Sequence, residues 1–261
     1  MKEHLKEVSY QPKPVKRVRI PKAGSNETRP LGIPTVTDRV VQQAVRLVLE
    51  PIYEHKFSDH SYGFRPGRSC HDALGRVNGQ LESGQTHVVD IDIKGYFDTI
   101  NQRRLMKLLK KDVSDSRLLC LVESFLKAGV LEDGAYAMSE EGTPQGGVIS
   151  PLLSNLYLDE LDHLMERSGY TMTRYADDIV VLCSSATEAM DALETVRAWM
   201  CEADLRLHPE KTGVVNMEEV GAYFDFLGYR FKRLQSGRLL KLCRPKSEQK
   251  LRRSIPTTTP T

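Results

Sequence analysis

A strictly alternating segment in the first half of the chain constrains the fold most strongly. In VVDIDIKGYFDTI every second residue is apolar, and the intervening positions become acidic along the segment. Successive side chains of a β-strand point to opposite faces of a sheet, so the pattern predicts a strand with one buried face and one partly polar face. The buried set is Val89, Ile91 and Ile93, and the other set is Val88, Asp90, Asp92 and Lys94.

The rest of the chain mixes helical patterns with hairpin patterns. A helix is predicted from an N-cap at Thr37 to Pro51, which ends it, and a second helix ends near Leu81. Further helices are predicted over about 102–111, 115–128 and 187–203, and in SPLLSNLYLDELDHLM. Strands or hairpins are predicted in VKRVRIPK, TRPLGIPT, TMTRYADDIVVLC, LRLHPEKTGVVN and YFDFLGYRFKRL. Helices combined with antiparallel hairpins, rather than regular strand–helix alternation, indicate an α+β fold.

The charges are distributed unevenly along the chain. Residues 1–50 carry a net charge of +5 and residues 230–261 a net charge of +9, whereas residues 51–229 carry −12. Basic ends around an acidic centre fit a polyanion-binding surface that frames a metal site, and they equally fit solvated tails. Charge alone does not decide between these two interpretations.

Nothing in the sequence points to a membrane or to secretion. The longest apolar run near a predicted strand, Ile179 to Cys183, is far shorter than the roughly 20 residues that span a bilayer. No charged-then-apolar signal segment opens the chain. The five cysteines show no C-x-x-C pair and no zinc-like spacing, which favours a reducing, intracellular compartment. The sequence therefore predicts a cytoplasmic protein with no membrane partner.

Three carboxylates are the strongest candidates for chemistry. Asp92 lies on the alternating strand, and Asp177 and Asp178 lie in the turn of a predicted hairpin. An Asp-Asp turn alone is more often explained by local hydrogen bonding. If the sheet brings Asp92 alongside, however, the three like charges raise one another's pKa unless cations neutralise them. Two Mg²⁺ ions bound by carboxylate oxygens would do this, and they would support nucleotidyl transfer at a phosphorus.

Seven sequence blocks resemble those of group II intron-encoded reverse transcriptases (maturases), in family order from about residue 10 to residue 232. They are RIPKAGSNETRPLGIPTVTDRVVQQAV, FSDHSYGFRPGRSCHDAL, VVDIDIKGYFDTI, GTPQGGVISPLLSNLYLDELD, RYADDIVVLC, LHPEKTG and FDFLGYRF. The resemblance implies the fingers and palm of a right-hand polymerase, an antiparallel sheet packed on helices. The blocks stop about where a thumb would start, so we expect the thumb to be absent, through excision or natural truncation. The expected division is 1–84 (fingers), 85–100 (first catalytic strand of the palm), 101–149 (fingers), 150–237 (catalytic hairpin of the palm) and 238–261 (start of a thumb or a disordered tail).

The resemblance also implies roles for the metal-binding residues. Asp92, Asp177 and Asp178 match the catalytic triad that binds two Mg²⁺ ions, for which Mn²⁺ is a possible substitute. The backbone carbonyl of Ile93 is expected to complete the coordination of one ion. Asp90 lies on the same strand face as Asp92, two residues earlier, and is interpreted as a structural neighbour.

Other positions match residues that contact nucleotide, template or primer in the family. Phe97 matches the aromatic beneath the incoming sugar, where a ring excludes a ribose 2′-OH and favours deoxynucleotides. Two cations near the triphosphate would neutralise the leaving pyrophosphate. Each residue also has a plain structural interpretation, such as a core aromatic, a solvated basic hairpin or an apolar turn. The expected nucleotide-binding residues are Lys22, Arg29, Phe97, Gln145 and Lys211, and the expected template or primer residues are Arg65, Gly146, Leu227 and Gly228.

The family resemblance predicts an RNA-directed DNA polymerase. The expected partners are an RNA template, intron RNA, a DNA or RNA primer and dNTPs, and a homodimer is conceivable because surface meant for a thumb would be exposed. In its full-length context the resemblance implies intron mobility and RNA splicing. Two alternatives stay open. The chain could be a catalytically weak module that binds intron RNA, or the reverse transcriptase of a retron, a diversity-generating system or a CRISPR-associated system.

Overall fold

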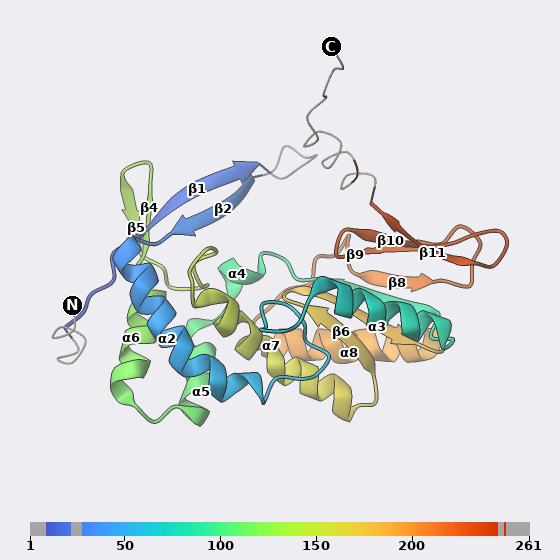
Figure 1. The fold of residues 1–261 in the computed structure, drawn as a ribbon, viewed down its shortest axis with the longest axis horizontal. Helices are drawn as coiled ribbons and strands as arrows, with labels where there is room; N and C mark the ends of the chain where they lie inside the picture. The colour runs from blue at the N-terminus through green and yellow to red at the C-terminus, as the bar shows by residue number, and fades with distance from the viewer. Residues whose placement is uncertain (1–8, 22–27, 245–247, 249–261) are drawn as a thin grey trace, which may run out of the picture.

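The computed structural model describes residues 9–21, 28–244 and 248 (Figure 1). The helices are α2 (Val36–Glu54), α3 (Cys70–Glu82), α4 (Tyr96–Thr99), α5 (Gln102–Asp112), α6 (Ser116–Leu126), α7 (Ser150–Arg167) and α8 (Ala186–Glu202). The strands are β1 (Val15–Pro21), β2 (Thr28–Ile33), β3 (His87–Asp92), β4 (Val130–Glu132), β5 (Ala135–Ala137), β6 (Thr171–Tyr175), β7 (Asp178–Cys183), β8 (Gly213–Asn216), β9 (Tyr223–Phe226), β10 (Tyr229–Arg233) and β11 (Leu239–Cys243). Helices and antiparallel sheets occur together, so the α+β prediction is confirmed.

The central sheet contains the alternating strand. Its strand order is β6-β7-β3-β8, and all three pairings are antiparallel. The side chains of Val89, Ile91 and Ile93 lie in one large hydrophobic core with residues of α7 and α8. Val88 points the other way into a second core, which it shares with α3 and the β9–β11 sheet. The period-2 pattern of the sequence therefore separates the two faces as predicted.

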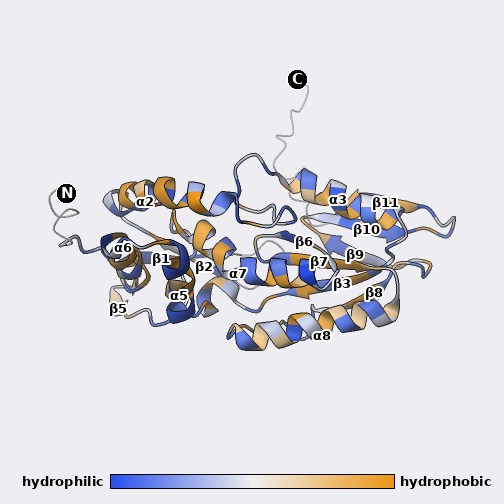
Figure 2. Cartoon of the chain, turned by 90° about the horizontal axis from the view of Figure 1, so that it is seen from below, coloured by the Kyte–Doolittle hydropathy of each residue, from blue (hydrophilic) through white to orange (hydrophobic). Residues whose placement is uncertain are grey.

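The layers on either side of the central sheet are visible from below the molecule. Figure 2 shows α8 along one face of the sheet, and α3 with β9, β10 and β11 along the other. Ser69 begins α3 through a reciprocal capping box with Asp72, which satisfies two backbone donors that the first helical turn leaves free. The stacked rings of Phe224 and Phe231 fill the second core between the two sheets.

The other end of the molecule consists of helices and a small sheet. The β1–β2 hairpin joins the β4–β5 hairpin through a parallel β1–β4 pairing, giving the order β2-β1-β4-β5. The sequence did not predict β4 and β5, because strands of three residues are too short to show a period. Residues of α2, α5, α6 and α7 all contribute to the large hydrophobic core.

Several element boundaries differ from the predicted ones. Thr35, not Thr37, caps α2 by accepting a hydrogen bond from the backbone N–H of Asp38. The helix also continues through Pro51 to Glu54, where a stop was predicted. Pro51 removes only the bond to the carbonyl of Leu47, and both residues lie on the exposed side where water reaches that carbonyl. The fully buried Tyr53 then anchors the last turn.

The chain after residue 237 contains one more strand than the sequence indicated. Residues 239–243, expected to be thumb or tail, form β11, which pairs with β10 along five residue pairs. Among the described residues, no helix combines the length and the apolar character needed to cross a bilayer. All five cysteines are free thiols, and only Cys183 is buried, where burial raises the pKa of its thiol to about 12.

Candidate active site

The register of the central sheet brings two of the predicted carboxylates together. Asp92, the last residue of β3, lies directly opposite Asp178, the first residue of β7. Cα atoms of directly opposed residues in an antiparallel pair are only about 4.5–5.5 Å apart, and their side chains share one face. The same face carries the apolar pair Val88–Leu182 at its other end. This face is therefore hydrophobic beneath α3 and acidic at the end of β3 and the start of β7.

The turn between β6 and β7 carries the third carboxylate. Ala176 has a φ of 59°, in the left-handed region that costs a non-glycine residue about 1 kcal/mol or more. The buried guanidinium of Arg174 donates to the Ala176 carbonyl at 3.0 Å and stabilises this conformation. Asp177 follows and lies next to Asp178, so the turn adds its carboxylate to the pair formed by Asp92 and Asp178.

A fully buried network beneath the turn holds it in place. Arg174 donates from Nε to Asp162 Oδ1 at 2.7 Å, makes a second bond from Nη2 to Asp162 Oδ2, and donates to Asn155 Oδ1 at 2.9 Å. Arg174 is 0% exposed, so these bonds compensate for the loss of water around its charge. This network was not predicted from the sequence, although an arginine in the strand that leads into the Asp-Asp turn, TMTRY, was a usable signal.

The loop between α2 and α3 packs against the same turn. Asn155 donates to the Gly63 carbonyl at 2.8 Å. A Cβ atom at Gly63 would lie 2.2 Å from the backbone nitrogen of Ala176, so only glycine allows this approach. Ser61 also forms an isolated parallel bridge with Arg174, which extends the edge of β6. The GFRPG block thus supports the turn that carries the carboxylates.

Burial and repulsion between like charges raise the pKa values of Asp90, Asp177 and Asp178. Burial, Asp177 and Asp92 together raise the pKa of Asp178 to about 6, although one side of Asp178 is open to solvent. Burial raises the pKa of Asp177. The charge of Asp92 raises this pKa further, and the charge of Arg29 lowers it. Asp90 has the largest shift, to about 7, through burial, Asp178 and Asp92. These residues form an acidic cluster that bound cations would stabilise.

Lys211 supplies a positive charge to this cluster. Its Nζ lies 2.8 Å from Asp92 Oδ2, and the Lys211 and Asp92 side chains are 57% and 37% exposed. The preceding loop is fixed to the end of β3, because the His208 N–H donates to the Asp92 carbonyl at 2.7 Å and Thr212 bonds to the Asp92 backbone. An ion pair this exposed contributes at most about 1 kcal/mol, so a divalent cation could replace it.

The carboxylate oxygens suit hard cations, but the side chains do not converge on one metal position. Among the described residues, no group of three or more His, Cys, Asp or Glu side chains is arranged to hold a metal ion. Asp92 points to Lys211 instead. Three adjacent carboxylates are nevertheless the oxygen ligands that Mg²⁺ prefers. Ile93 is buried and forms an isolated bridge with Leu207. The backbone N–H groups of the neighbouring residues Lys94 and His208 donate the hydrogen bonds of this bridge.

A cavity of about 500 Å³ contains two of the predicted nucleotide-binding residues. Phe97 of α4 and Gln145 both line it, together with Pro30 and Gly32 of β2. The Gly32 N–H donates to the Gln145 carbonyl at 2.7 Å. Gly146, with φ 112°, packs so closely that a Cβ atom would lie 2.7 Å from the Gly32 carbonyl oxygen. The TPQGG loop and the β1–β2 hairpin are thereby fixed together beside Phe97.

The donors of Arg65 are all engaged within the protein. Nε and Nη2 bond to the Glu54 carboxylate (3.0 and 2.9 Å), and Nη1 and Nη2 donate to the carbonyls of Ser58 (2.5 Å), Ser61 (2.8 Å) and Glu54 (3.0 Å). The side chain is 3% exposed, and the guanidinium also lies over the Phe57 ring. Arg65 therefore holds the loop together in this structure, and its predicted place near template or triphosphate stays a prediction.

Of the other predicted residues, two lie in the turn between β9 and β10, and one lies outside the described chain. Leu227 (φ 48°) and Gly228 (φ 82°) form the tight turn between β9 and β10. The Arg244 N–H donates to the Gly228 carbonyl, and the Arg244 charge lowers the pKa of Asp178. This turn is thus connected to the acidic cluster through Arg244. Lys22 lies outside the described residues.

The arrangement of the elements is that of a right-hand polymerase, with fingers and a palm. A telomerase from Candida albicans, in complex with a TWJ fragment of telomeric RNA, superposes with a TM-score of 0.68 at 15% identity, over 93% of this chain and 47% of the telomerase chain. The family model described as reverse transcriptase (RNA-dependent DNA polymerase) matches residues 20–231. The chain therefore belongs to the reverse transcriptase family.

Its relatives include group II intron-encoded proteins. The group II intron-encoded protein LtrA of Lactococcus lactis subsp. cremoris is 49% identical over 160 residues, which cover 61% of this chain and 26% of LtrA. Protein YkfC of Escherichia coli K12 is 37% identical over 275 residues, covering 90% of this chain and 71% of YkfC. The chain thus matches only about a quarter of the length of LtrA.

Replacing Arg174 tests the support of the turn. In Arg174→Met the carboxylate of Asp162 stays buried without its partner, so we expect the free energy of unfolding to fall by about 3–5 kcal/mol. The double variant Asp162→Leu/Arg174→Met should be less destabilised than the single one, because no unpaired charge remains. Urea denaturation measures both. A single-variant loss below about 1 kcal/mol would contradict the role of the network.

The raised pKa of Asp90 predicts a pH-dependent stability. Its folded pKa of about 7 exceeds the unfolded value of about 4, so folded protein binds this proton more tightly. The stabilising contribution of this bound proton to folding is fully present below about pH 4 and is lost as the pH rises through 7. In metal-free buffer, Asp90→Asn should therefore be about 1–3 kcal/mol more stable than the unmodified protein at pH 8, and similar to it near pH 4. The exposed Asp191→Asn is the control and should show the unmodified pH profile.

Proposed function

We propose that this chain catalyses RNA-templated DNA synthesis, with Asp92, Asp177 and Asp178 as its metal-binding catalytic residues. The observation that carries the proposal is the register pair Asp92–Asp178 with Asp177 in the adjoining turn. Membership of the reverse transcriptase family supports it. The raised pKa values of Asp177 and Asp178 support it too, because a site that concentrates negative charge is stabilised by divalent ions.

The three carboxylates would hold two Mg²⁺ ions, or Mn²⁺ as a substitute, with the Ile93 carbonyl as a further ligand. When bound, these ions would lower the pKa of an attacking hydroxyl and neutralise charge on the leaving group. In the reaction the primer 3′-oxygen forms a bond with the α-phosphorus of a dNTP, and pyrophosphate leaves. Lys211, once displaced from Asp92, would be free to donate a proton to that pyrophosphate. Arg29, whose charge already acts on Asp177, would contact the triphosphate together with Lys22.

Phe97 and Gln145 would define the nucleotide site. Both line the same cavity, and the hydrogen bond from Gly32 to Gln145 fixes the loop beside it. A half-buried ring at Phe97 would contact the sugar and exclude a 2′-hydroxyl. Gly146 in the close approach to β2 and the Leu227–Gly228 turn would face template and primer. The fingers would then comprise residues 1–84 and 101–149, and the palm 85–100 and 150–237.

The biological setting proposed is that of a group II intron. The identity with LtrA supports a role of the full-length protein in intron mobility and RNA splicing, with intron RNA as a partner. A second candidate is an RNA-binding module with weak catalysis. The contact of Asp92 with Lys211 and the open arrangement of the carboxylates favour it, because the site needs rearrangement before it binds ions.

A primer-extension assay separates these two candidates. With excess primed RNA template, dNTPs and Mg²⁺, we expect extension that EDTA abolishes and that Asp177→Ala reduces by roughly a hundredfold or more, because a metal ligand is lost. Asp191→Ala, which removes an exposed carboxylate from α8, is the matched control and should extend like the unmodified protein. Equal extension by Asp177→Ala and the unmodified protein would contradict the assigned site.

The sugar contact of Phe97 can be tested by nucleotide selectivity. Phe97→Ala opens space for a 2′-hydroxyl, so we expect ribonucleotide incorporation relative to deoxynucleotide to rise roughly 10- to 100-fold. Phe97→Tyr keeps the ring and should keep the discrimination. The measurement is kcat/KM for matched dNTP and rNTP on one template. Unchanged selectivity in Phe97→Ala would remove Phe97 from the nucleotide site.

A further inference from the structure

The cations of α5 fall into two groups with different surroundings. Arg104 and Lys111 both pair with Glu160 of α7, at 2.6 and 2.8 Å. The other three cations have no ion pair with any described residue. These are Arg103, Lys107 and Lys110, called the α5 row below.

The α5 row lies along one exposed face of the helix. Its members are spaced i, i+4 and i+7, which puts them on one side over a length of about 10 Å. All three are exposed, whereas Leu105 and Leu109 on the opposite side are fully buried in the core. Like charges at this spacing repel one another and weaken the helix slightly. Only Lys110, in the last turn, has a compensating interaction with the helix dipole, so the stability of the fold does not account for the row as a whole.

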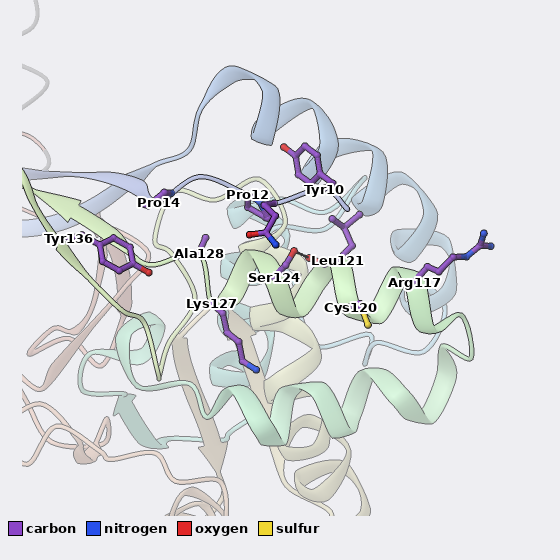
Figure 3. A pocket seen from close by; sticks show the side chains of 11 residues that line it. Tyr10, Pro12, Pro14, Arg117, Cys120, Leu121, Ser124, Lys127, Ala128 and Tyr136 are labelled. Atoms are coloured by element: carbon purple, nitrogen blue, oxygen red, sulfur yellow. Dashed lines mark hydrogen bonds between the residues drawn. The ribbon is translucent and has the colours of Figure 1, made fainter. Parts of the chain in front are cut away.

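A groove runs beside the row and continues towards a second cavity. The groove has a volume of about 840 Å³ and is lined by all three cations and by Lys127. Lys127 also lines a cavity of about 490 Å³ between residues 10–14 and α6, where Tyr10 and the 55%-exposed ring of Tyr136 are found (Figure 3). Three carboxylates also line the groove, those of Glu123, Glu140 and Glu141. Glu123 pairs with Lys127 at 2.5 Å, so among the described residues that line the groove only the α5 row offers cations without a partner. An anionic ligand would therefore lie along the α5 side.

The chemistry of the row selects among possible anionic partners. A membrane surface is disfavoured because the apolar side of α5 is buried and cannot enter a bilayer. A protein interface would need a sizeable apolar centre, whereas among the residues that line the groove only Met138 is a large, exposed apolar side chain. Evenly spaced Lys and Arg along a helix fit the regularly spaced phosphates of a nucleic acid backbone, and the exposed Tyr136 ring offers a base a stacking surface.

We propose that the α5 row, which contributes no residue to the candidate active site, binds the phosphate backbone of a structured RNA in the groove that adjoins that site. The inference rests on the proposed function only in taking RNA as the partner. Figure 1 shows α5 on the side of the helices that faces away from the β1–β2 hairpin. Residues 138–141 nevertheless line both the groove and the Phe97–Gln145 cavity, so RNA on α5 would run next to the candidate nucleotide site.

Two double variants with the same change of charge test the proposal. Lys107→Gln/Lys110→Gln removes two unpaired lysines of the row. Lys56→Gln/Lys111→Gln removes two lysines already paired with Asp112 and Glu160. The probe is an end-labelled RNA stem-loop, and its dissociation constant is measured over a series of salt concentrations. Thermal melting checks that both variants are folded.

We expect the row variant to bind the stem-loop roughly 5- to 20-fold more weakly, and its salt slope to fall by nearly 2, at about 0.9 for each lost phosphate contact. The paired-lysine variant should stay close to the unmodified protein. Equal losses in the two variants, or no loss in either, would overturn the proposal. A polyglutamate peptide provides a further test. If it binds as tightly as the RNA and loses affinity to the same extent in the row variant, the proposal is overturned, because the partner would then be an acidic protein.

Extension of a short primer–template separates this inference from the proposed activity. The row variant should extend like the unmodified protein, since α5 contributes no residue to the candidate active site. A selective loss of stem-loop binding in the row variant would support the RNA surface even if no protein extended the primer. Loss of extension in the row variant alone would contradict the proposal, because the row would then act on the primer–template at the adjoining nucleotide site.

Discussion

The antiparallel register between β3 and β7 is the constraint on which the rest of the structure depends. It places Asp92 opposite Asp178 on one face and leaves Val89 and Ile91 on the other, within the core. A slip of one residue would turn the carboxylates into the core and the apolar side chains outward. The hydrophobic pattern of β3 therefore fixes the position of the acidic residues as firmly as it fixes the core.

This acidic cluster is held against its own repulsion by groups beneath and beside it. The bonds of Arg174 to Asp162, Asn155 and the Ala176 carbonyl fix the turn from below. The close contact of Gly63 with Ala176 fixes it from the side. Lys211 and Arg244 supply charge that partly offsets the repulsion. A rigid scaffold thus keeps like charges together, at a cost to stability that the cations we propose as ligands of this cluster would offset.

Much of the fold and the site followed from local patterns and from the family blocks. Strict alternation predicted β3 and its two faces, and the Asp177–Asp178 turn was predicted as the end of a hairpin. Long-range contacts could not be predicted in this way. The contacts of the Arg65 side chain depend on carbonyls of a loop that folds around it. Arg174 is buried only because α7 supplies Asp162 as its partner. The strands β4 and β5 have three residues each, and β11 (LLKLC) shows no alternation, so the pairing of all three depends on neighbouring strands.

The central claim is that the carboxylates at the end of β3 and in the β6–β7 turn bind divalent cations together. Electron paramagnetic resonance of free Mn²⁺ during a titration measures this directly, without requiring catalysis. We predict that the unmodified protein and Asp191→Asn remove the same amount of free Mn²⁺ signal, and that Asp178→Asn removes far less. Equal Mn²⁺ binding by Asp178→Asn and the unmodified protein would contradict the account.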